Sequence, residues 1–323
     1  MAACCFLVSP RHLDTSAIHL LAATSKLDFR QPPSLALLEA ELQDNTQSIV
    51  IWDVDHRRAL EKDYPFRLNA VHAVLSRNIL SNRVFAVGDQ LPNTIPELFK
   101  QGGFSHYLLR RFDGPAIKII SQLAMASISP HPFGLDLYVP KGVAIQQIIL
   151  DDSAKKDAAA QAVGNVLIKK GIPSRIANRV ASAVDELIMN AIFDAPVNGQ
   201  GERYRKQQDR GAKFKLQDRE RVELRFGTTA TYAAISVKDQ FGSLEQDTVM
   251  KFLKRNYQNE SYTGREDSAG AGLGIYGILE GGLSLLFLSQ SNFCTEVTLF
   301  FPLVKSAKEF KEGFRFFSFV HKN

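Results

Sequence analysis

The chain has 323 residues, of which 45% are hydrophobic and 23% are charged, and its formal net charge is +5. This length suits two domains better than one, and the composition excludes a disordered chain and a fibrous repeat. No uncharged apolar stretch approaches the ~20 residues that span a bilayer, so we expect no membrane segment.

The cysteines and the N-terminus bear on the compartment. Cys4, Cys5 and Cys294 have neither the number nor the spacing of a disulfide framework, a metal site or a redox motif. A reducing compartment fits this pattern best, and we expect a cytoplasmic protein. The N-terminal run MAACCFLVSPRH has no charged leader, which predicts a first strand and not a secretion signal.

The first ~135 residues alternate short apolar runs with helical patterns, which predicts a doubly wound parallel sheet. Proline and glycine recur from Ser127 to Gly142, which indicates a domain boundary that we place after residue 138. The predicted strands are Cys4 to Val8, Ser48 to Val54, Arg83 to Val87 and His106 to Leu109. The predicted helices include Leu35 to Leu42, Ile95 to Gln101 and Pro115 to Ala126.

This order of elements resembles a response-regulator receiver domain, and the run GGFSHYLLRRF is similar to that family's fifth-strand signature. The resemblance places Asp53 at the phospho-acceptor position. However, Ser9 and Pro10 replace the acidic pair that holds magnesium, Gly88 replaces the Ser or Thr switch, and Arg110 replaces the lysine. We therefore interpret residues 1–138 as a pseudo-receiver in which Asp53 is a vestigial phospho-acceptor. A role in capping a helix or forming a turn is favoured for this aspartate. The expected use of the pseudo-receiver is a docking or dimerisation surface.

The second half, residues 139–323, predicts an α+β domain. A strand at Val143 to Leu150 precedes a helix that stops at Gly171, and a second helix starts near Ser174. The apolar residues of this second helix recur at three and four positions, so one face should pack against a sheet. A polar stripe runs along it, which alone is most often the solvated side of a helix: Asn178, Ser182, Glu186, Asn190 and Asp194.

Two features downstream of this helix support a functional interpretation of its polar stripe. The strand Thr231 to Lys238 ends in Asp239, and SAGAGLGIY, Ser268 to Tyr276, places alternating glycines directly before a helix. Glycines at a helix N-terminus let backbone N–H groups approach phosphate oxygens. Such glycines also make plain turns, so the order of the features decides.

That order resembles the Bergerat-fold ATPases, the superfamily of gyrase, the heat-shock chaperone, histidine kinases and MutL. The resemblance covers about Val143 to Pro302 and rests on the polar helix, the strand-end aspartate, the glycine loop and a Thr-Glu-Val strand. The runs AVDELIMNAIFDAP and GAGLGIYGILEGG look most like the anti-sigma-factor serine kinases. The resemblance implies a two-layer α+β sandwich that binds ATP and Mg²⁺.

Carried over by position, the resemblance also implies roles. Glu186 is the candidate general base, Asn190 the magnesium ligand, Asp239 the acceptor for the adenine amino group, and Thr295 its neighbour. Departures occur at Phe241, which intervenes in the first glycine box, and at Cys294, where a glycine often stands. The glycine boxes are Gly242 in the first and Gly270, Gly272, Leu273 and Gly274 in the second. The expected lid is Ser243 to Ala269, in which Lys251, Lys254, Arg255 and Arg265 either reach a phosphate or are solvated.

A basic insertion follows Asp194 and has no place in the compact kinase pattern. Its stretch Arg203 to Arg221 contains eight Lys and Arg. Segments added to a compact fold usually form surface loops that carry a function, so we expect a surface loop with a function of its own. A solvated loop is the favoured interpretation, and nucleic acid is the minor alternative because no nucleic-acid-binding motif accompanies the charge.

Two functions stay open at this stage. The first is an ATP-dependent protein kinase that phosphorylates a serine or threonine of a protein partner. The second is a non-catalytic ATP-sensing module that controls a protein-protein interaction. A histidine kinase is disfavoured, because His72 in LNAVHAVLSR lacks the expected acidic neighbour. The C-terminal alternation from Phe314 to Val320 predicts an added core strand or a partner surface.

Overall fold

The computed structural model describes residues 3–9, 16–45, 47–54, 68–89, 99, 104–110, 112, 114–257 and 271–322. It divides into two compact units: unit 1 comprises Met1–Pro132 and Phe314–Ser318, and unit 2 comprises Phe133–Gly313 and Phe319–Asn323. The division falls within the proline- and glycine-rich stretch, and the boundary after residue 138 stays a prediction. The chain is mixed α/β, as expected from its sequence.

Unit 1 contains a parallel sheet in the order β2-β1-β3-β4-β5. This order occurs in doubly wound α/β sheets. Its central strands are continuous apolar runs, because helices cover both faces and every side chain is buried. The strands are β1 (Cys4–Val8), β2 (Asp28–Arg30), β3 (Ile49–Asp53), β4 (Val84–Gly88) and β5 (His106–Leu109).

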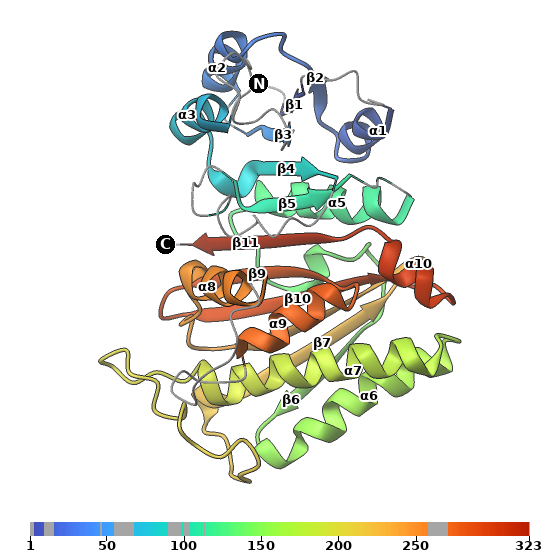
Figure 1. Ribbon diagram of the computed structural model, residues 1–323, viewed down its shortest axis with the longest axis vertical. Coiled ribbons are helices and arrows are strands. Elements are labelled where there is room, and N and C mark those ends of the chain that lie inside the picture. The colour runs from blue at the N-terminus through green and yellow to red at the C-terminus, as the bar shows by residue number, and fades with distance from the viewer. Residues whose placement is uncertain are drawn as a thin grey trace. The chain divides into compact units, whose positions relative to one another are not determined.

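The helices of unit 1 lie in two pairs (Figure 1): α1 packs against α5, and α2 packs against α3. The four predicted strands are confirmed, and so are the helices at α2 and α5. The predicted helix at Ile95 to Gln101 lies outside the described residues except for Phe99. The helices are α1 (Ser16–Thr24), α2 (Leu35–Asp44), α3 (Leu68–Asn78) and α5 (Gly114–Ser127), with a short 3₁₀ turn η1 (Ser81–Arg83) before β4.

The C-terminal strand β11 (Phe316–Lys322) confirms the strand predicted from the phenylalanine alternation. In unit 1, Phe316–Ser318 pair antiparallel with β5. His106 of β5 is held there between the Ser318 hydroxyl, at 2.8 Å from Nδ1, and the Asn82 carbonyl oxygen, at 2.9 Å from Nε2. In unit 2, Phe319 stacks on Phe287.

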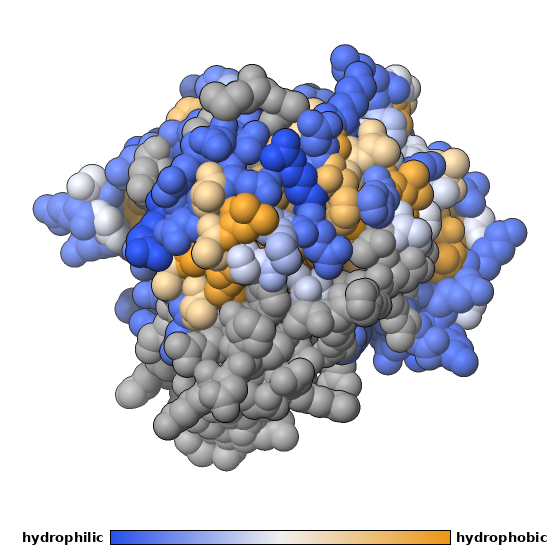
Figure 2. All heavy atoms as spheres, turned by 90° about the horizontal axis from the view of Figure 1, so that it is seen from above, coloured by the Kyte–Doolittle hydropathy of each residue, from blue (hydrophilic) through white to orange (hydrophobic). Residues whose placement is uncertain are grey.

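The described surface seen in Figure 2 is mostly hydrophilic, with hydrophobic residues in small groups. The large hydrophobic side chains exposed in unit 1 include Leu20, Leu37, Leu80 and Met125. Scattered exposed apolar residues are normal on a protein surface. In the part of the chain that is described, no helix combines the length and hydrophobicity that crossing a membrane requires.

Unit 2 contains an antiparallel sheet in the order β9-β10-β8-β7-β6. The helices α6, α7, α8 and α9 lie on one side of it (Figure 1). Its strands are β6 (Ile145–Leu150), β7 (Val222–Thr228), β8 (Tyr232–Asp239), β9 (Ser284–Gln290) and β10 (Cys294–Pro302). The strands predicted at Val143 to Leu150 and at Thr231 to Lys238 are confirmed.

The predicted end of the first helix of unit 2 and the predicted start of the second are confirmed. Gly171, with φ of +82°, follows α6, and α7 starts at Ser174 behind Pro173. The apolar residues of α7 are buried, which confirms its predicted packing face. The helices are α6 (Lys156–Lys169), α7 (Ser174–Met189), α8 (Gln246–Tyr257), α9 (Ala271–Glu280) and α10 (Ala307–Glu312), with 3₁₀ turns η2 (Leu135–Leu137), η3 (Ser153–Lys155) and η5 (Asp218–Glu220).

A π-helical turn, η4 (Asn190–Asp194), extends α7. Its widened turn is closed by the Ala195 N–H, which donates to the Asn190 carbonyl oxygen at 2.9 Å. The sequence predicts a continuous α-helix here, and the π-turn changes the directions in which residues after Met189 point. Single π-turns within helices occur often at functional sites.

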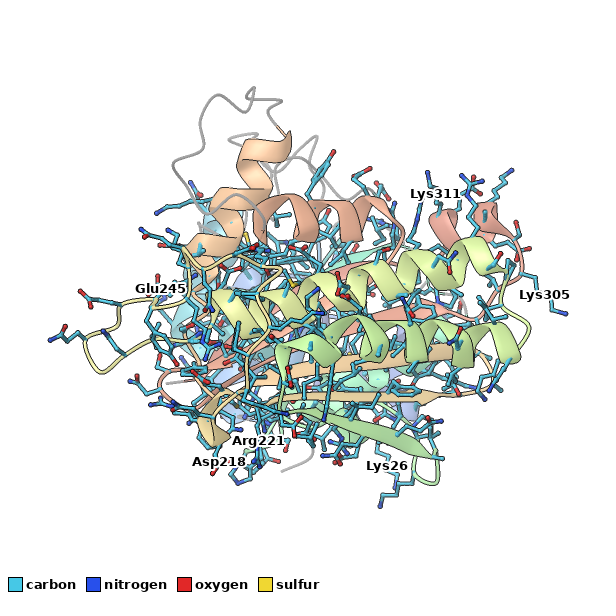
Figure 3. The ribbon with its side chains drawn as sticks, turned by 90° about the horizontal axis from the view of Figure 1, so that it is seen from below. Lys26, Asp218, Arg221, Glu245, Lys305 and Lys311 are labelled. Carbon is cyan, nitrogen blue, oxygen red and sulfur yellow. The ribbon has the colours of Figure 1, made fainter. Side chains whose placement is uncertain are left out.

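The basic insertion between η4 and β7 folds onto unit 2 by its own contacts. Arg205 binds the buried Glu220 at 2.6 Å and lies over the Phe214 ring at 4.1 Å. The Ser153 hydroxyl accepts the Phe214 N–H at 2.9 Å. At the surface, Arg221 and Asp218 form an ion pair of 2.8 Å and lie side by side in Figure 3. Most of the insertion is exposed, as expected for a solvated loop, whereas Arg205 and Phe214 are partly buried.

Candidate functional site

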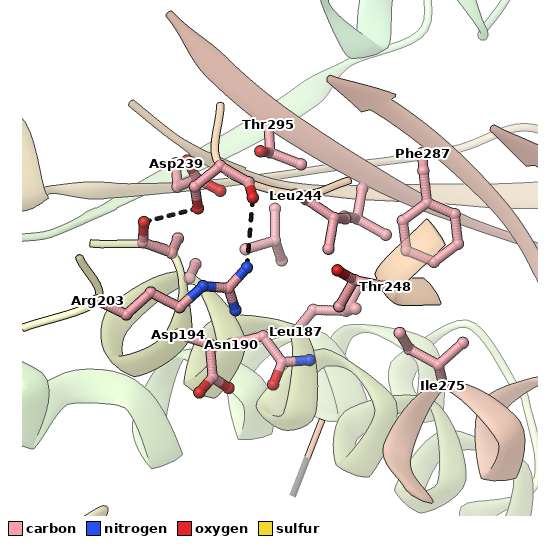
Figure 4. A pocket seen from close by; sticks show the side chains of 15 residues that line it. Leu187, Asn190, Asp194, Arg203, Asp239, Leu244, Thr248, Ile275, Phe287 and Thr295 are labelled. Carbon is pink, nitrogen blue, oxygen red and sulfur yellow. Dashed lines mark hydrogen bonds between the residues drawn. The ribbon is translucent and has the colours of Figure 1, made fainter. Parts of the chain in front are cut away.

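A cavity of about 620 Å³, including its open mouth, lies between the helices and the sheet of unit 2. Its lining combines apolar side chains with a few polar groups, as the lining of small-molecule sites does. Figure 4 shows residues that line it. The apolar lining is Leu187, Ala191, Ala195, Val237, Leu244, Ile275, Phe287 and Val297, and the polar lining is Asn190, Asp194, Arg203, Asp239, Ser243, Thr248 and Thr295.

Asp239 and Thr295 lie directly opposite each other on the antiparallel strands β8 and β10. Both are buried, and both line the cavity. Asp239 Oδ1 accepts the N–H groups of Phe241 at 2.8 Å and of Gly242 at 3.3 Å. Burial raises the pKa of Asp239 to about 6, and hydrogen bonds from Phe241, Gly242 and Thr295 oppose this rise.

Gly242 closes the turn that wraps this aspartate. Its φ is +64°, and a Cβ at this position would lie 1.9 Å from the Gln290 carbonyl oxygen. Only glycine fits both the left-handed backbone and the close approach. The intervening Phe241 therefore leaves the turn intact, because its own N–H is one of the donors to Asp239.

Asn190 and Asp194 reach the cavity from the π-turn. Asp194 binds Arg210 through an ion pair of 2.8 Å. Burial raises the pKa of Asp194, and Arg210, Arg203 and Lys206 oppose that rise. The residues of α7 and η4 that line the cavity are Leu187, Asn190, Ala191 and Asp194. Two of them, Asn190 and Asp194, belong to the predicted polar stripe, whereas Glu186 of the stripe is not part of the lining.

Two buried oxygens near this face have no hydrogen-bond donor among the described residues: Asn190 Oδ1 and Glu186 Oε1. Amide and carboxylate oxygens are the ligands that Mg²⁺ prefers, and it commonly takes only one or two from the protein and the rest from phosphate and water. No cluster of three or more His, Cys, Asp or Glu that could hold a metal occurs within the described ranges. Asn190, which lines the cavity, therefore offers one oxygen that could bind such a cation.

Glu186 lies beside the cavity lining and packs against α9. A Cβ on Gly274 would be 2.2 Å from Glu186 Oε1, so the α9 backbone lies directly against this carboxyl group. Burial raises the pKa of Glu186; Asp194 and Asp185 add to the rise, whereas Arg210 and a hydrogen bond from Asn190 oppose it. A carboxyl group with a raised pKa is a better proton acceptor near neutral pH.

The second glycine box has a different local structure from the predicted loop. Gly272, Leu273 and Gly274 lie in the first turn of α9, which begins at Ala271, and Gly270 lies outside the described residues. In the expected lid, α8 is helical and its Lys251 is exposed. Arg265 and the side chains of Lys254 and Arg255 lie outside the described residues. Their contacts with phosphate stay predictions.

Arg203, Ser243 and Thr248 line the cavity but are not predicted from the sequence as individual site residues. The Arg203 guanidinium donates to the Ser243 carbonyl oxygen at 3.3 Å, and the Ser243 hydroxyl donates to the Ala195 carbonyl oxygen at 2.8 Å. The only sequence signal for Arg203 is the density of positive charge in the insertion.

In unit 1, Asp53 lies at the end of β3 with a fully buried side chain. Arg110 forms an ion pair with it and with Asp89, the latter at 3.0 Å. The Ser9 hydroxyl donates to Asp53 Oδ2 at 2.8 Å. Both carboxylate oxygens of Asp53 thus have protein partners. His72 lies half-buried in α3.

No protein-family model matches this chain, and no curated protein matches it either. Its function is therefore inferred from its own residues.

Proposed function

We propose that unit 2 is an ATP- and Mg²⁺-binding signalling domain of the Bergerat type, and that it phosphorylates a serine or threonine of a protein partner. The observation that carries the proposal is the gathering of Asn190, Asp239 and Thr295 in one cavity. These residues come from η4, β8 and β10, and the same three were assigned to a nucleotide from the resemblance.

Base recognition is assigned to the end of β8. Two backbone N–H groups donate to Asp239 Oδ1 and hold the carboxylate in place, and Oδ2 is assigned as the acceptor for the adenine amino group. A hydrogen-bond acceptor in this place favours adenine over guanine, which carries a carbonyl oxygen at the corresponding position. The apolar walls, such as Val297 and Ile275, supply the surface for the purine faces.

Phosphate binding is assigned to Asn190 and the start of α9. Bound Mg²⁺ supplies charge neutralisation on the phosphates. The Asn190 side-chain oxygen is the protein group that would hold it. The first backbone N–H groups of α9 offer an anion site of the kind that helix N-termini provide.

The transfer step uses Glu186 as the proton acceptor. The partner's hydroxyl oxygen forms a bond to the γ-phosphorus, the bond between that phosphorus and ADP breaks, and Glu186 takes the hydroxyl proton. The raised pKa of Glu186 suits a base that works near neutral pH.

A second function is favoured by the packing of Glu186 against Gly274. A carboxylate covered by the α9 backbone has restricted access to a partner's hydroxyl group. On this alternative, ATP and Mg²⁺ order the lid and switch a protein-protein surface without turnover. In both versions unit 1 is a pseudo-receiver that serves as a docking or dimerisation surface, and the cytoplasm is the proposed location.

Nucleotide binding is tested by calorimetric titration of the full chain with ATP, GTP and ATP plus Mg²⁺. We expect ATP to bind more tightly than GTP, and Mg²⁺ to strengthen ATP binding in the wild type but much less in Asn190→Ala. Arg221→Gln, at an exposed surface pair, is the matched control and should bind as the wild type does. Absence of ATP binding by the wild type refutes the proposal.

Transfer is tested with γ-labelled ATP, Mg²⁺ and a lysate of the source, comparing wild type with Glu186→Ala and Glu186→Gln. Label on a partner's serine or threonine with the wild type alone supports the kinase. Equal ATP binding by all three proteins without transfer to any partner supports the sensing module and rejects the kinase.

A further inference from the structure

We propose that the basic insertion supplies a nucleotide-binding residue to the cavity: Arg203 binds a phosphate oxygen of the bound nucleotide. This inference rests on the proposed function, and it assigns a specific role to a segment that the compact kinase pattern lacks. The geometry points to it because Arg203 lines the same cavity as Asn190 and Asp239 (Figure 4).

The partners of the other half-buried arginines in the insertion set Arg203 apart. Arg205 binds Glu220 at 2.6 Å, and Arg210 binds Asp194 at 2.8 Å. Arg203 forms no ion pair among the described residues, and its guanidinium donates a hydrogen bond to the Ser243 carbonyl oxygen at 3.3 Å. A guanidinium has five N–H donors, so most of its donors are available to a ligand.

The carboxylates of the cavity have direct partners other than Arg203. Two carboxylates line it within the described residues, Asp194 and Asp239. Asp194 forms an ion pair with Arg210, and Asp239 Oδ1 accepts hydrogen bonds from two backbone N–H groups. The positive charge of Arg203 is therefore not cancelled by a direct ion pair, and a guanidinium suits phosphate recognition through paired N–H···O contacts.

The Arg203 side chain is also held in place. Its hydrogen bond to the Ser243 carbonyl oxygen connects the insertion to the turn after β8, and the neighbouring Arg205 is anchored between Glu220 and Phe214. A ligand group bound by a side chain that is already positioned costs less conformational entropy. Arg203 is thus presented to the cavity by the fold of the insertion.

The competing explanation is that Arg203 only forms a wall of the cavity through Ser243. The two roles differ in how they depend on the ligand's phosphates. A phosphate contact affects AMP, ADP and ATP but not adenosine, whereas a wall affects all four ligands alike.

The experiment measures the affinities of the full chain for adenosine, AMP, ADP and ATP by calorimetry or ligand-observed NMR. It compares wild type with Arg203→Gln, which keeps a donor for the Ser243 carbonyl oxygen but removes the charge, and with Arg203→Lys, which keeps the charge. Arg221→Gln is the matched control on the same insertion, and circular dichroism and Tm report folding.

We expect Arg203→Gln to weaken the three phosphorylated ligands by about 10- to 100-fold, the range for a lost charge-assisted hydrogen bond. Adenosine affinity should stay within about twofold, because no charged contact is lost. Arg203→Lys should recover part of the loss, and raised salt should weaken ATP binding more in the wild type than in Arg203→Gln.

Equal losses for adenosine and ATP overturn the inference in favour of the wall, and unchanged ATP affinity in Arg203→Gln overturns it outright. If Arg203→Gln does not fold, two other measurements decide: the salt dependence of ATP binding by the wild type, and the affinities of Arg203→Lys for adenosine, AMP, ADP and ATP. Equal effects on adenosine and ATP then again overturn the inference. Failure of the proposed function looks different, since the wild type then binds neither adenosine nor ATP, and the inference falls with it.

Discussion

Asp239 and Thr295 face each other across the β8 and β10 ladder, at the place where both strands reach the cavity. The sequence separates them by more than fifty positions. Burial puts the carboxyl group in surroundings that disfavour its charge, which raises its pKa to about 6. An ionised carboxylate in such surroundings lowers the stability of the folded state. Binding sites often contain groups that lower stability in this way.

Asp239→Asn is expected to stabilise the ligand-free chain at neutral pH while abolishing the preference for ATP over GTP. Because the folded pKa exceeds the unfolded value of 3.8, the folded state binds the proton more tightly, and this contribution to stability is lost as the pH rises from 3.8 through 6. The difference in unfolding free energy between Asp239→Asn and wild type should therefore grow by up to ~3 kcal/mol between pH 4 and pH 7.

Urea unfolding at pH 4, 5.5 and 7 measures this difference, and titration with both nucleotides measures selectivity. Asparagine keeps an oxygen for the Phe241 and Gly242 N–H groups, so the turn should survive. A variant that is less stable than the wild type at pH 7 would show that the Asp239 charge is not the destabilising element.

Gly274→Ala tests the packing of α9 on Glu186. The added Cβ would lie 2.2 Å from Glu186 Oε1, so the carboxyl group has to move. We expect a loss of about 1–3 kcal/mol in unfolding free energy, the usual cost of overpacking. Combining it with Glu186→Ala should recover most of the loss, which a double-mutant cycle measures.

Gly277→Ala is the matched control in the same helix, because a Cβ there meets nothing within 4 Å. It should be neutral or stabilise the chain by up to ~1 kcal/mol through helix propensity. Equal effects of the two alanine substitutions would contradict the close contact between Gly274 and Glu186.

Asp53→Ala is expected to destabilise the chain by about 3 kcal/mol, because it leaves the largely buried Arg110 without its main partner. Asp89→Ala removes the exposed partner of the same arginine and should cost less than about 1 kcal/mol. Chemical denaturation of both variants measures the difference.

The same contacts predict that Asp53 is not phosphorylated. Its oxygens are engaged by Arg110 and by the Ser9 hydroxyl, so neither is free to attack a phosphoryl donor. Incubation with acetyl phosphate and Mg²⁺, followed by intact-mass measurement, should show no added phosphoryl group. An added group that disappears in Asp53→Asn would restore the phospho-acceptor role.

Strands such as β1 and β3 could be predicted from the sequence, because a strand buried on both faces is a continuous apolar run. The three-residue strand β2 could not, since Asp28–Arg30 is polar, partly exposed and too short to show a period. The helix α7 was predictable from its apolar period, but the π-turn at its end was not. Its sequence continues the same spacing, and only the hydrogen-bond register differs.

For the site, Asn190, Asp239 and Thr295 could be proposed from the sequence because each has a motif position in the resemblance, and all three line one cavity. Arg203 belongs to an insertion, where no spacing rule links a residue to a pocket. Its location depends on long-range contacts such as Arg205 with Glu220. Charge density alone could indicate an anionic ligand but not which arginine meets it.

The buried His106 should make unit 1 sensitive to acid. Burial lowers the pKa of His106 from its ordinary value of 6.5 to about 4, although a hydrogen bond to the Asn82 carbonyl oxygen opposes the shift. Between these values the unfolded chain binds the proton more tightly, so stability is lost as the pH falls from 6.5 to 4, by up to ~3 kcal/mol. His106→Gln should remove this pH dependence from unfolding free energies measured across that range. Ser318→Ala keeps the histidine, so it should retain the pH dependence of the unfolding free energy. An unchanged pH profile in His106→Gln would mean that other groups cause the acid sensitivity.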